Sequence, residues 1–173
     1  MKSITVENLL GNHKSYTQVT GDEEALKRVI QTGEINRPGF ELAGFFKHSD
    51  FRRIIVFGDK EMAFIAEMSE ERQKEIFPCL INEEVPCIVI CKGHECPKVL
   101  KDVANERNFP IFQTELITGA VSSELMNTLE EKLAKDTLMH GVFLNIHGKG
   151  VIIKGDSGIG KSETGLELVK RGH

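Results

Sequence analysis

Residues Gly155 to Ser162 read Gly-Asp-Ser-Gly-Ile-Gly-Lys-Ser and fit the pattern Gly-x-x-x-x-Gly-Lys-Ser/Thr at every fixed position. This spacing is typical of a loop that wraps around phosphate groups, because glycines let successive backbone N–H groups turn toward an anion. Lys161 adds a positive charge for the β- and γ-phosphates, and Ser162 offers a hydroxyl to Mg²⁺. The residues that we expect at the phosphates are Gly155, Asp156, Ser157, Gly158, Ile159, Gly160, Lys161 and Ser162. The pattern leaves open whether the phosphates belong to ATP, GTP or pyrophosphate, and whether a phosphoryl group is transferred or only sensed.

The residues on either side of this loop predict the elements that position it. Val151 to Lys154 is a short apolar segment typical of a strand, and a helical pattern follows Lys161. A helix that begins there directs the positive end of its dipole at the phosphates. Upstream, the segments Gly141 to Ile146 and Gly150 to Lys154 predict a hairpin with its turn at Gly148-Lys149-Gly150.

Near residues 133–137 the sequence changes from an amphipathic helical pattern to two short apolar segments. This change predicts a boundary between two units, residues 1–133 and residues 134–173. The second unit has fewer residues than a stable hydrophobic core requires. We therefore expect residues 134–173 to be the opening of a larger domain and the chain to be truncated.

Hydrophobic periodicity in the first unit alternates between strand and helix, which predicts an α/β fold. Strands are expected over Lys2 to Val6, Arg53 to Phe57, Pro86 to Cys91 and Pro110 to Phe112. Helices are expected over Asp22 to Thr32, from Ser69 until Pro78 breaks or kinks it, over Pro97 to Asn108, and over Ser122 to Asp136 with a capped start. Turns are expected at Arg37-Pro38-Gly39 and at Gly58-Asp59. The intervals between residues 50 and 115 favour βαβ crossovers and a mostly parallel sheet with flanking helices.

The four cysteines, Cys79, Cys87, Cys91 and Cys96, do not have the paired spacing of a structural zinc site. Cys87 and Cys91 lie in an apolar segment, where a cysteine usually acts as a small buried hydrophobe. We therefore favour buried thiols over a metal site that includes His94. Asp59 follows an apolar strand as a metal-holding aspartate would, but a turn explains it adequately.

Composition excludes several classes of protein. The chain of 173 residues has 22 Lys and Arg against 26 Asp and Glu, a net charge of −4, and 40% hydrophobic residues. No general basic field exists to hold nucleic acid or anionic lipid, and no apolar run is long enough to span a membrane. The first ten residues lack the apolar core of an export signal. We expect a cytoplasmic protein with no nucleic-acid or membrane partner.

Two segments resemble a known family. The run from His140 through the loop to His173, and the segment Arg37-Pro-Gly-Phe-Glu-Leu-Ala-Gly44, are similar to bacterial HPr kinase/phosphorylase. The resemblance covers essentially the whole chain and implies an N-terminal α/β regulatory or assembly domain. The opening hairpin, P-loop and helix of a phosphoenolpyruvate-carboxykinase-like kinase domain would follow it.

The activity implied by the resemblance is bifunctional. Such an enzyme phosphorylates a serine of the phosphocarrier protein HPr with ATP or pyrophosphate and Mg²⁺, removes that phosphate by phosphorolysis, and regulates carbon catabolite repression as a homohexamer. By position, Lys161 would be the phosphate-binding lysine, Ser162 the metal ligand and His140 a catalytic histidine. The proton-accepting acid, the second metal ligand and the HPr-binding residues are expected beyond His173, so this chain alone is expected to be inactive.

The sequence departs from the family at two places. Asn145 to Gly150 is less apolar than expected, and Gly165 stands where alanine is usual. Two other functions stay open: another P-loop kinase or NTPase, and, for this fragment, a non-catalytic sensor or assembly domain.

Overall fold

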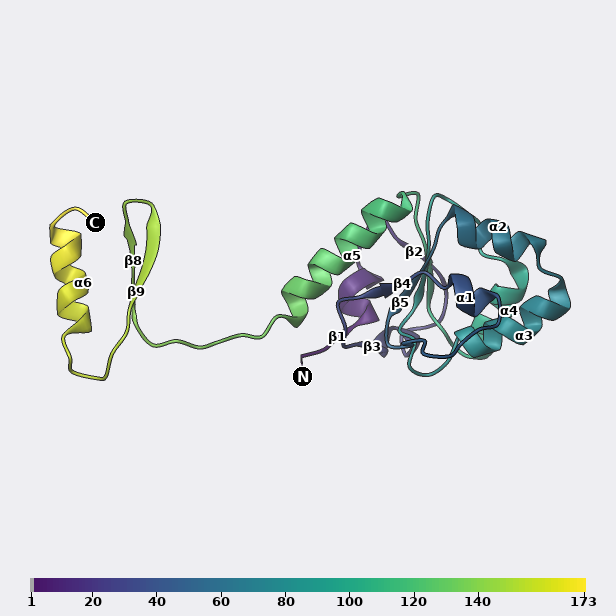
Figure 1. Ribbon diagram of the computed structural model, residues 1–173, viewed down its shortest axis with the longest axis horizontal. Coiled ribbons are helices and arrows are strands. Elements are labelled where there is room, and N and C mark those ends of the chain that lie inside the picture. Colours follow the sequence, from purple (N-terminus) through teal and green to yellow (C-terminus); the bar gives the residue numbers. More distant parts are fainter. Residues whose placement is uncertain (1) are drawn as a thin grey trace. The chain divides into compact units, whose positions relative to one another are not determined.

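The computed structural model describes residues 2–173, and these residues form two compact units that divide between Ala134 and Lys135. The first unit is built on a five-stranded mixed sheet with the order β2-β7-β6-β5-β4 (Figure 1). Its strands are β2 (Thr17–Thr20), β4 (Ile35–Asn36), β5 (Ile54–Phe57), β6 (Ile88–Ile90) and β7 (Ile111–Gln113). β4, β5, β6 and β7 are parallel, and β2 pairs with β7 antiparallel at one edge. The mostly parallel sheet predicted between residues 50 and 115 is therefore confirmed.

Both faces of the sheet are covered. Side chains alternate along β5, so that Ile55 and Phe57 join one hydrophobic cluster while Ile54 and Val56 join the other. The first cluster packs under α1 (Gly39–Leu42), α2 (Asp59–Glu67), α3 (Glu70–Leu80) and α4 (Lys98–Glu106). The second packs under α5 (Thr118–Leu133) and the N-terminal elements β1 (Ile4–Thr5), π-helix η1 (Glu7–Gly11) and β3 (Val29–Ile30). Figure 1 shows α5 on the opposite side of the sheet from α1 to α4. Such double coverage explains why every residue of β5 is buried.

The thiols predicted to be buried are confirmed. Cys87 and Cys91 flank β6 in the cluster beneath α5, and both are fully buried. Burial raises the pKa of Cys91 to about 11, so its thiol stays protonated at neutral pH. Among residues 2–173, no group of three or more His, Cys, Asp or Glu side chains lies close enough to hold a metal ion.

The helix predicted over Asp22 to Thr32 is wrong. A single 3-10 turn, η2 (Ala25–Lys27), is followed by strand β3. One oxygen of Asp22 accepts hydrogen bonds from the Glu24 and Ala25 N–H groups, as a helix N-cap does, but only the single 3-10 turn follows it. Ile30 then pairs with Ile4 of β1 and is fully buried, so strand pairing outweighs the helical spacing.

Smaller corrections concern where helices begin and end. Pro78 lies inside α3, and the helix ends two residues later at Leu80, so the proline stands in the last turn of the helix and does not divide it. α5 begins at Thr118, four residues before Ser122, and the Ser122 hydroxyl donates to the Thr118 carbonyl from within the helix rather than capping its start. Asp59 is the first residue of α2 and not part of a separate turn. Ser69 does cap α3 as predicted, since its hydroxyl accepts a hydrogen bond from the Arg72 N–H.

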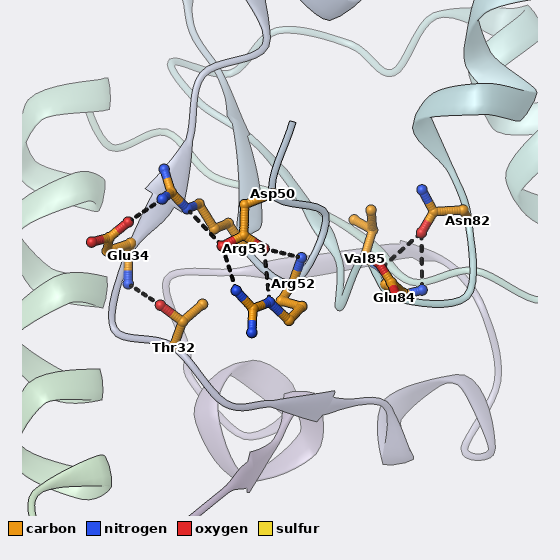
Figure 2. A network of polar contacts seen from close by, with 8 residues as sticks. All are labelled: Thr32, Glu34, Asp50, Arg52, Arg53, Asn82, Glu84 and Val85. Atoms are coloured by element: carbon orange, nitrogen blue, oxygen red, sulfur yellow. Dashed lines mark hydrogen bonds and ion pairs between the residues drawn. The ribbon is translucent and has the colours of Figure 1, made fainter. Parts of the chain in front are cut away.

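A polar network fixes the loop that enters β5 (Figure 2). Both side-chain oxygens of Asp50 accept hydrogen bonds of 2.9 Å from Arg52. Arg53 forms an ion pair with Glu34 and a longer one with Asp50 at 3.6 Å. The hydrogen bonds from Arg52 lower the pKa of Asp50 to about 2. This network lies before β5, at the end of the sheet opposite its carboxyl edge.

The second unit contains the predicted hairpin and helix. β8 (Val142–Ile146) pairs antiparallel with β9 (Lys149–Ile153), and α6 (Lys161–Lys170) follows. The turn is formed by His147 and Gly148, with φ of 50° and 78°, and not by residues 148–150. Two successive positive φ values are the geometry of a tight two-residue hairpin turn, which leaves Lys149 in the strand. Within residues 2–173, none of the helices combines the length and the apolar composition that a membrane span requires.

Candidate functional site

The Gly155 to Ser162 loop joins the end of β9 to the start of α6, as its sequence context predicts. Gly158 and Gly160 have φ of 83° and 89°, a left-handed conformation that only glycine adopts without strain. At Gly155 a Cβ atom would lie 2.9 Å from Cγ2 of Ile159, so a larger residue would disturb the loop. The backbone thus curves in a way that requires glycine at three positions.

Lys161 folds back over the loop that precedes it. Its ammonium donates hydrogen bonds to the carbonyl oxygens of Gly155 at 2.7 Å and Asp156 at 2.6 Å. A lysine ammonium has three donors, so these two bonds leave capacity for an additional acceptor. The Lys161 charge is therefore held against the loop and not extended into solvent.

The first turn of α6 adds further donors. Gly160 is the residue before the helix, and its carbonyl accepts from both the N–H and the hydroxyl of Thr164. Ser162 is exposed in this first turn, where backbone N–H groups have no partner within the helix. Glycine curvature, a lysine ammonium and a helix N-terminus together form a cradle suited to phosphate oxygens.

His140 is exposed and lies two residues before β8. Val142 at the start of β8 pairs with Ile153 at the end of β9, so residues before 142 and after 153 lie at the same end of the hairpin. The register therefore brings His140 to the end where the loop begins. His147 and His173, to which the sequence assigned no role, contact each other edge to face, with ring centroids 5.0 Å apart.

The structure explains the unusual glycine in α6. Gly165 is the buried residue of the helix, and a Cβ atom there would lie 2.7 Å from Cγ1 of Val142. The missing side chain lets α6 approach β8 closely, which offsets the roughly 1 kcal/mol that glycine costs in a helix relative to alanine.

A second group of polar residues lies in the first unit, at the carboxyl end of β5. Glu61 accepts hydrogen bonds of 2.8 Å from both the Arg37 guanidinium and the Gly58 N–H. Burial would raise the pKa of Glu61, but these hydrogen bonds outweigh it, so the net pKa is lowered. The buried carboxylate therefore remains ionised and holds Arg37 in place.

Asp59 is the adjacent part of this group. One of its oxygens accepts from Lys92 and the other lies 2.9 Å from Nε2 of His94. These contacts lower the pKa of Asp59, and the hydrogen bond from Lys92 has the largest effect, followed by that from His94. Sequence reasoning considered Asp59 and the turn at Arg37 separately and missed their proximity. Their proximity could have been predicted, because Arg37 and Asp59 each follow a parallel strand, and residues in such positions meet at one edge of a sheet.

Comparisons with known proteins cover both units. A family model described as HPr Serine kinase N terminus matches residues 4–129, and one described as HPr Serine kinase C-terminal domain matches residues 131–173. The chain is also similar to a solved structure of the CBS and DRTGG domains of the regulatory region of Clostridium perfringens pyrophosphatase, with 17% identity and a TM-score of 0.47 over 72% of this chain and 48% of that one. That similarity is too low to support an inference about ligands or function.

Curated relatives named HPr kinase/phosphorylase are much closer. The chain is 45% identical to that of Exiguobacterium sp. over 90% of this chain and 50% of the relative. It is 42% identical to that of Enterococcus faecalis over 97% and 52%, and 40% identical to that of Streptococcus sanguinis over 99% and 55%. The chain thus spans about half the length of these relatives. Because the two family models together match nearly all of its residues, the chain belongs to the HPr serine kinase family.

Proposed function

We propose that this chain is part of a bifunctional HPr kinase/phosphorylase. The enzyme transfers a phosphoryl group from ATP or pyrophosphate to a serine of HPr and removes it by phosphorolysis, in carbon catabolite repression. The observation that carries the proposal is the Gly155 to Ser162 loop, which combines left-handed glycines, the Lys161 ammonium and the start of α6 in a family whose members are named for this activity. The alternatives of another P-loop kinase or a plain NTPase have no comparable support.

Each residue of the loop has a defined task in this proposal. The N–H groups of residues 155–162 bind the phosphate oxygens, and Lys161 exchanges a loop carbonyl for an oxygen of the β- or γ-phosphate. Ser162 binds Mg²⁺ through its exposed hydroxyl, and the ion would neutralise charge on the transferred group. In this proposal His140 is a catalytic residue beside the reacting phosphate, because the hairpin register brings it to the end where the loop begins.

Other parts of the proposal concern the whole protein. Residues 1–133 form a regulatory or assembly domain, and residues 134–173 form the start of a phosphoenolpyruvate-carboxykinase-like P-loop domain. The intact enzyme is a cytoplasmic homohexamer whose proton acceptor, second metal ligand and HPr-binding residues lie outside residues 1–173. The two family models support the division into two domains, because one matches residues 4–129 and the other residues 131–173.

The proposal is tested with Lys161→Ala in the full-length enzyme, with Lys170→Ala as a matched control. Lys170 is an exposed lysine in the last turn of the same helix. We expect Lys161→Ala to lose both ATP-dependent and pyrophosphate-dependent phosphorylation of HPr by at least about 100-fold, as when a preorganised charge contact is removed. Near-normal activity of Lys161→Ala would refute its role. If the intact enzyme is incubated with labelled ATP and HPr and the HPr stays unlabelled, this result would instead refute HPr as the substrate.

A second experiment concerns this chain by itself. We expect calorimetry of residues 1–173 with ATP and Mg²⁺ to detect weak binding or none, because a strand, loop and helix alone bury little of a nucleotide. Micromolar affinity would contradict the view that further elements are needed to complete the site.

A further inference from the structure

A cavity of ≈ 380 Å³ lies at the amino ends of β6 and β7, opposite the edge of the sheet that holds Arg37 and Asp59. Residues from separate segments of the first unit line it: Arg28 before β3, Ile81, Asn82 and Glu83 after α3, Arg107 after α4, and Phe109 before β7. No residue of the Gly155 to Ser162 loop belongs to this lining. The cavity is therefore separate from the site of the proposed phosphoryl transfer.

Two arginines in the lining lack a carboxylate partner. Within residues 2–173, the side chains of Arg28 and Arg107 donate hydrogen bonds only to backbone carbonyl oxygens and form no ion pair. Glu83 also lines the cavity, but it is exposed and is not paired with either guanidinium in the described part of the chain. Arg28 is half-buried, and this burial lowers the pKa of Arg28. Because removing an unpaired charge from water is costly, such a site favours an anionic ligand.

The two guanidiniums are anchored to neighbouring residues of one loop. Nη2 of Arg28 donates to the Asn82 carbonyl, and Nη1 of Arg107 donates to the Ile81 carbonyl at 2.6 Å. The Arg28 guanidinium also lies over the Phe109 ring, 5.0 Å from the ring centroid. Since Ile81 and Asn82 are consecutive, both charges are held close to the same short stretch of backbone.

The loop that anchors the arginines is itself fixed by a turn (Figure 2). Oδ1 of Asn82 accepts hydrogen bonds from the Glu84 N–H at 2.9 Å and the Val85 N–H at 3.3 Å. Val85 is fully buried, and its carbonyl accepts from Nε of Arg28 at 3.0 Å. The donors are therefore positioned before a ligand arrives, which reduces the entropy lost on binding.

Both guanidiniums retain N–H groups for a ligand. Arg28 uses Nε and Nη2, while Arg107 uses only Nη1 for both of its carbonyl partners. Among the described residues, Nη1 of Arg28 and both Nε and Nη2 of Arg107 therefore have no partner. The Nε and Nη2 edge of a guanidinium forms a planar fork that matches the two oxygens of a carboxylate.

The helix ends at this cavity favour a carboxylate over a phosphate. α3 ends at Leu80 and α4 ends at Glu106, so the residues that follow two helix C-termini line the cavity. A helix C-terminus presents carbonyl oxygens, whereas phosphate sites use the N–H groups of a helix N-terminus. The charged donors available here are guanidinium forks, and these suit a planar carboxylate.

We propose that this cavity binds a small dicarboxylate. Arg28 and Arg107 each donate to one carboxylate group, and the apolar side chains of Ile81 and Phe109 line the space for the carbon chain between them. A volume of ≈ 380 Å³ is at the lower end of the range for small-molecule sites, so it accommodates a short dicarboxylate but not a folded partner. A ligand site of this kind goes beyond the kinase and phosphorylase activities proposed for the loop.

The test compares succinate, propionate and inorganic phosphate as ligands of the 173-residue chain. Each is titrated at constant pH and ionic strength while backbone amide shifts are followed by NMR. We expect succinate to produce saturable shifts at Asn82, Glu83 and Arg107. Propionate has a single carboxylate and should bind at least about tenfold more weakly, because it can satisfy only one arginine. Inorganic phosphate should produce no saturable shift at these residues.

Arg107→Lys keeps the positive charge but removes the planar fork, so it should weaken succinate binding about five- to tenfold. Arg72→Lys is the matched control, because Arg72 is an exposed arginine of α3 that also donates to a backbone carbonyl but does not line the cavity. Arg107 is exposed, so thermal unfolding should show that Arg107→Lys folds normally.

Three results would each overturn the proposal. The first is the absence of saturable shifts at the cavity with succinate, and the second is inorganic phosphate binding there as tightly as succinate. The third is Arg107→Lys binding succinate no more weakly than Arg72→Lys does. None of these measurements involves HPr or the Gly155 to Ser162 loop, so failure of this proposal is distinguishable from failure of the proposed function.

Discussion

The contact between Glu61 and its two donors gives a prediction that follows directly from geometry. In Glu61→Ala, the buried Gly58 N–H loses its partner at 2.8 Å and Arg37 loses its carboxylate. An unsatisfied buried N–H costs about 1–3 kcal/mol, and the half-exposed Arg37 recovers part of its loss from water. We therefore expect Glu61→Ala to lower the free energy of unfolding by about 2–4 kcal/mol. Glu61→Gln keeps an acceptor for Gly58 and should lose only about 1–2 kcal/mol.

Urea unfolding followed by circular dichroism measures these differences. With a denaturant slope of about 2 kcal/mol per M, the middle of the usual range, Glu61→Ala should move the midpoint down by about 1–2 M. Glu67→Gln, an exposed change on the same helix, is the control and should stay within about 0.5 kcal/mol of the parent. An effect of Glu61→Ala no larger than that of Glu67→Gln would refute the reasoning.

The pH dependence has a definite sign. The folded-state pKa of Glu61 is lowered from 4.5, so its ionised form stabilises the fold above that value and the contribution is lost as pH falls through the folded pKa. The stability difference between the parent and Glu61→Gln should therefore be constant near neutral pH and narrow below about pH 4.5. A difference that widens on acidification would contradict the proposed ionised pair.

Three more predictions rest on close packing and on burial. Gly58→Ala places a Cβ atom 2.4 Å from Oγ1 of Thr118 and should cost about 1–3 kcal/mol in urea unfolding, much of which Thr118→Ala should restore in the double variant. Gly165→Ala should reduce hydrogen-exchange protection in α6 and β8, because its Cβ atom meets Val142 at 2.7 Å; if protection increases instead, helix propensity outweighs the clash. Cys79 is exposed, while burial raises the pKa of the other three thiols, so Ellman's reagent should titrate one thiol rapidly in the native chain and four in urea. Rapid reaction of more than one native thiol would contradict the described packing.

Local chemistry made much of the molecule predictable. A candidate phosphate-binding loop could be located from eight consecutive residues, because glycine, lysine and serine at that spacing are typical of such loops. Strands such as β5 and β6 were predictable because both faces of a parallel sheet are buried, which requires continuous apolar runs. Ser69 was predictable as a cap because its hydroxyl acts on an N–H only three residues away.

The errors share one physical cause. Residues 22–32 have helical spacing, yet Ile30 pairs with Ile4 of β1, a partner distant in sequence. Ser122 has a capping side chain, yet α5 begins four residues earlier, at the sheet edge where Thr118 packs against Gly58. In both cases, contacts between segments far apart in the chain outweighed local preference.

The sequence by itself was enough to predict a phosphate-binding loop at residues 155–162, an α/β first unit and a similarity to the HPr kinase family. Only the tertiary structure decided that Arg28 and Arg107, which are far apart in the sequence, line one cavity. It also decided that Gly165 is a packing requirement of α6 against β8. The reason is that a loop motif is written in adjacent residues, whereas a site at the edge of a sheet exists only once the strands have aligned.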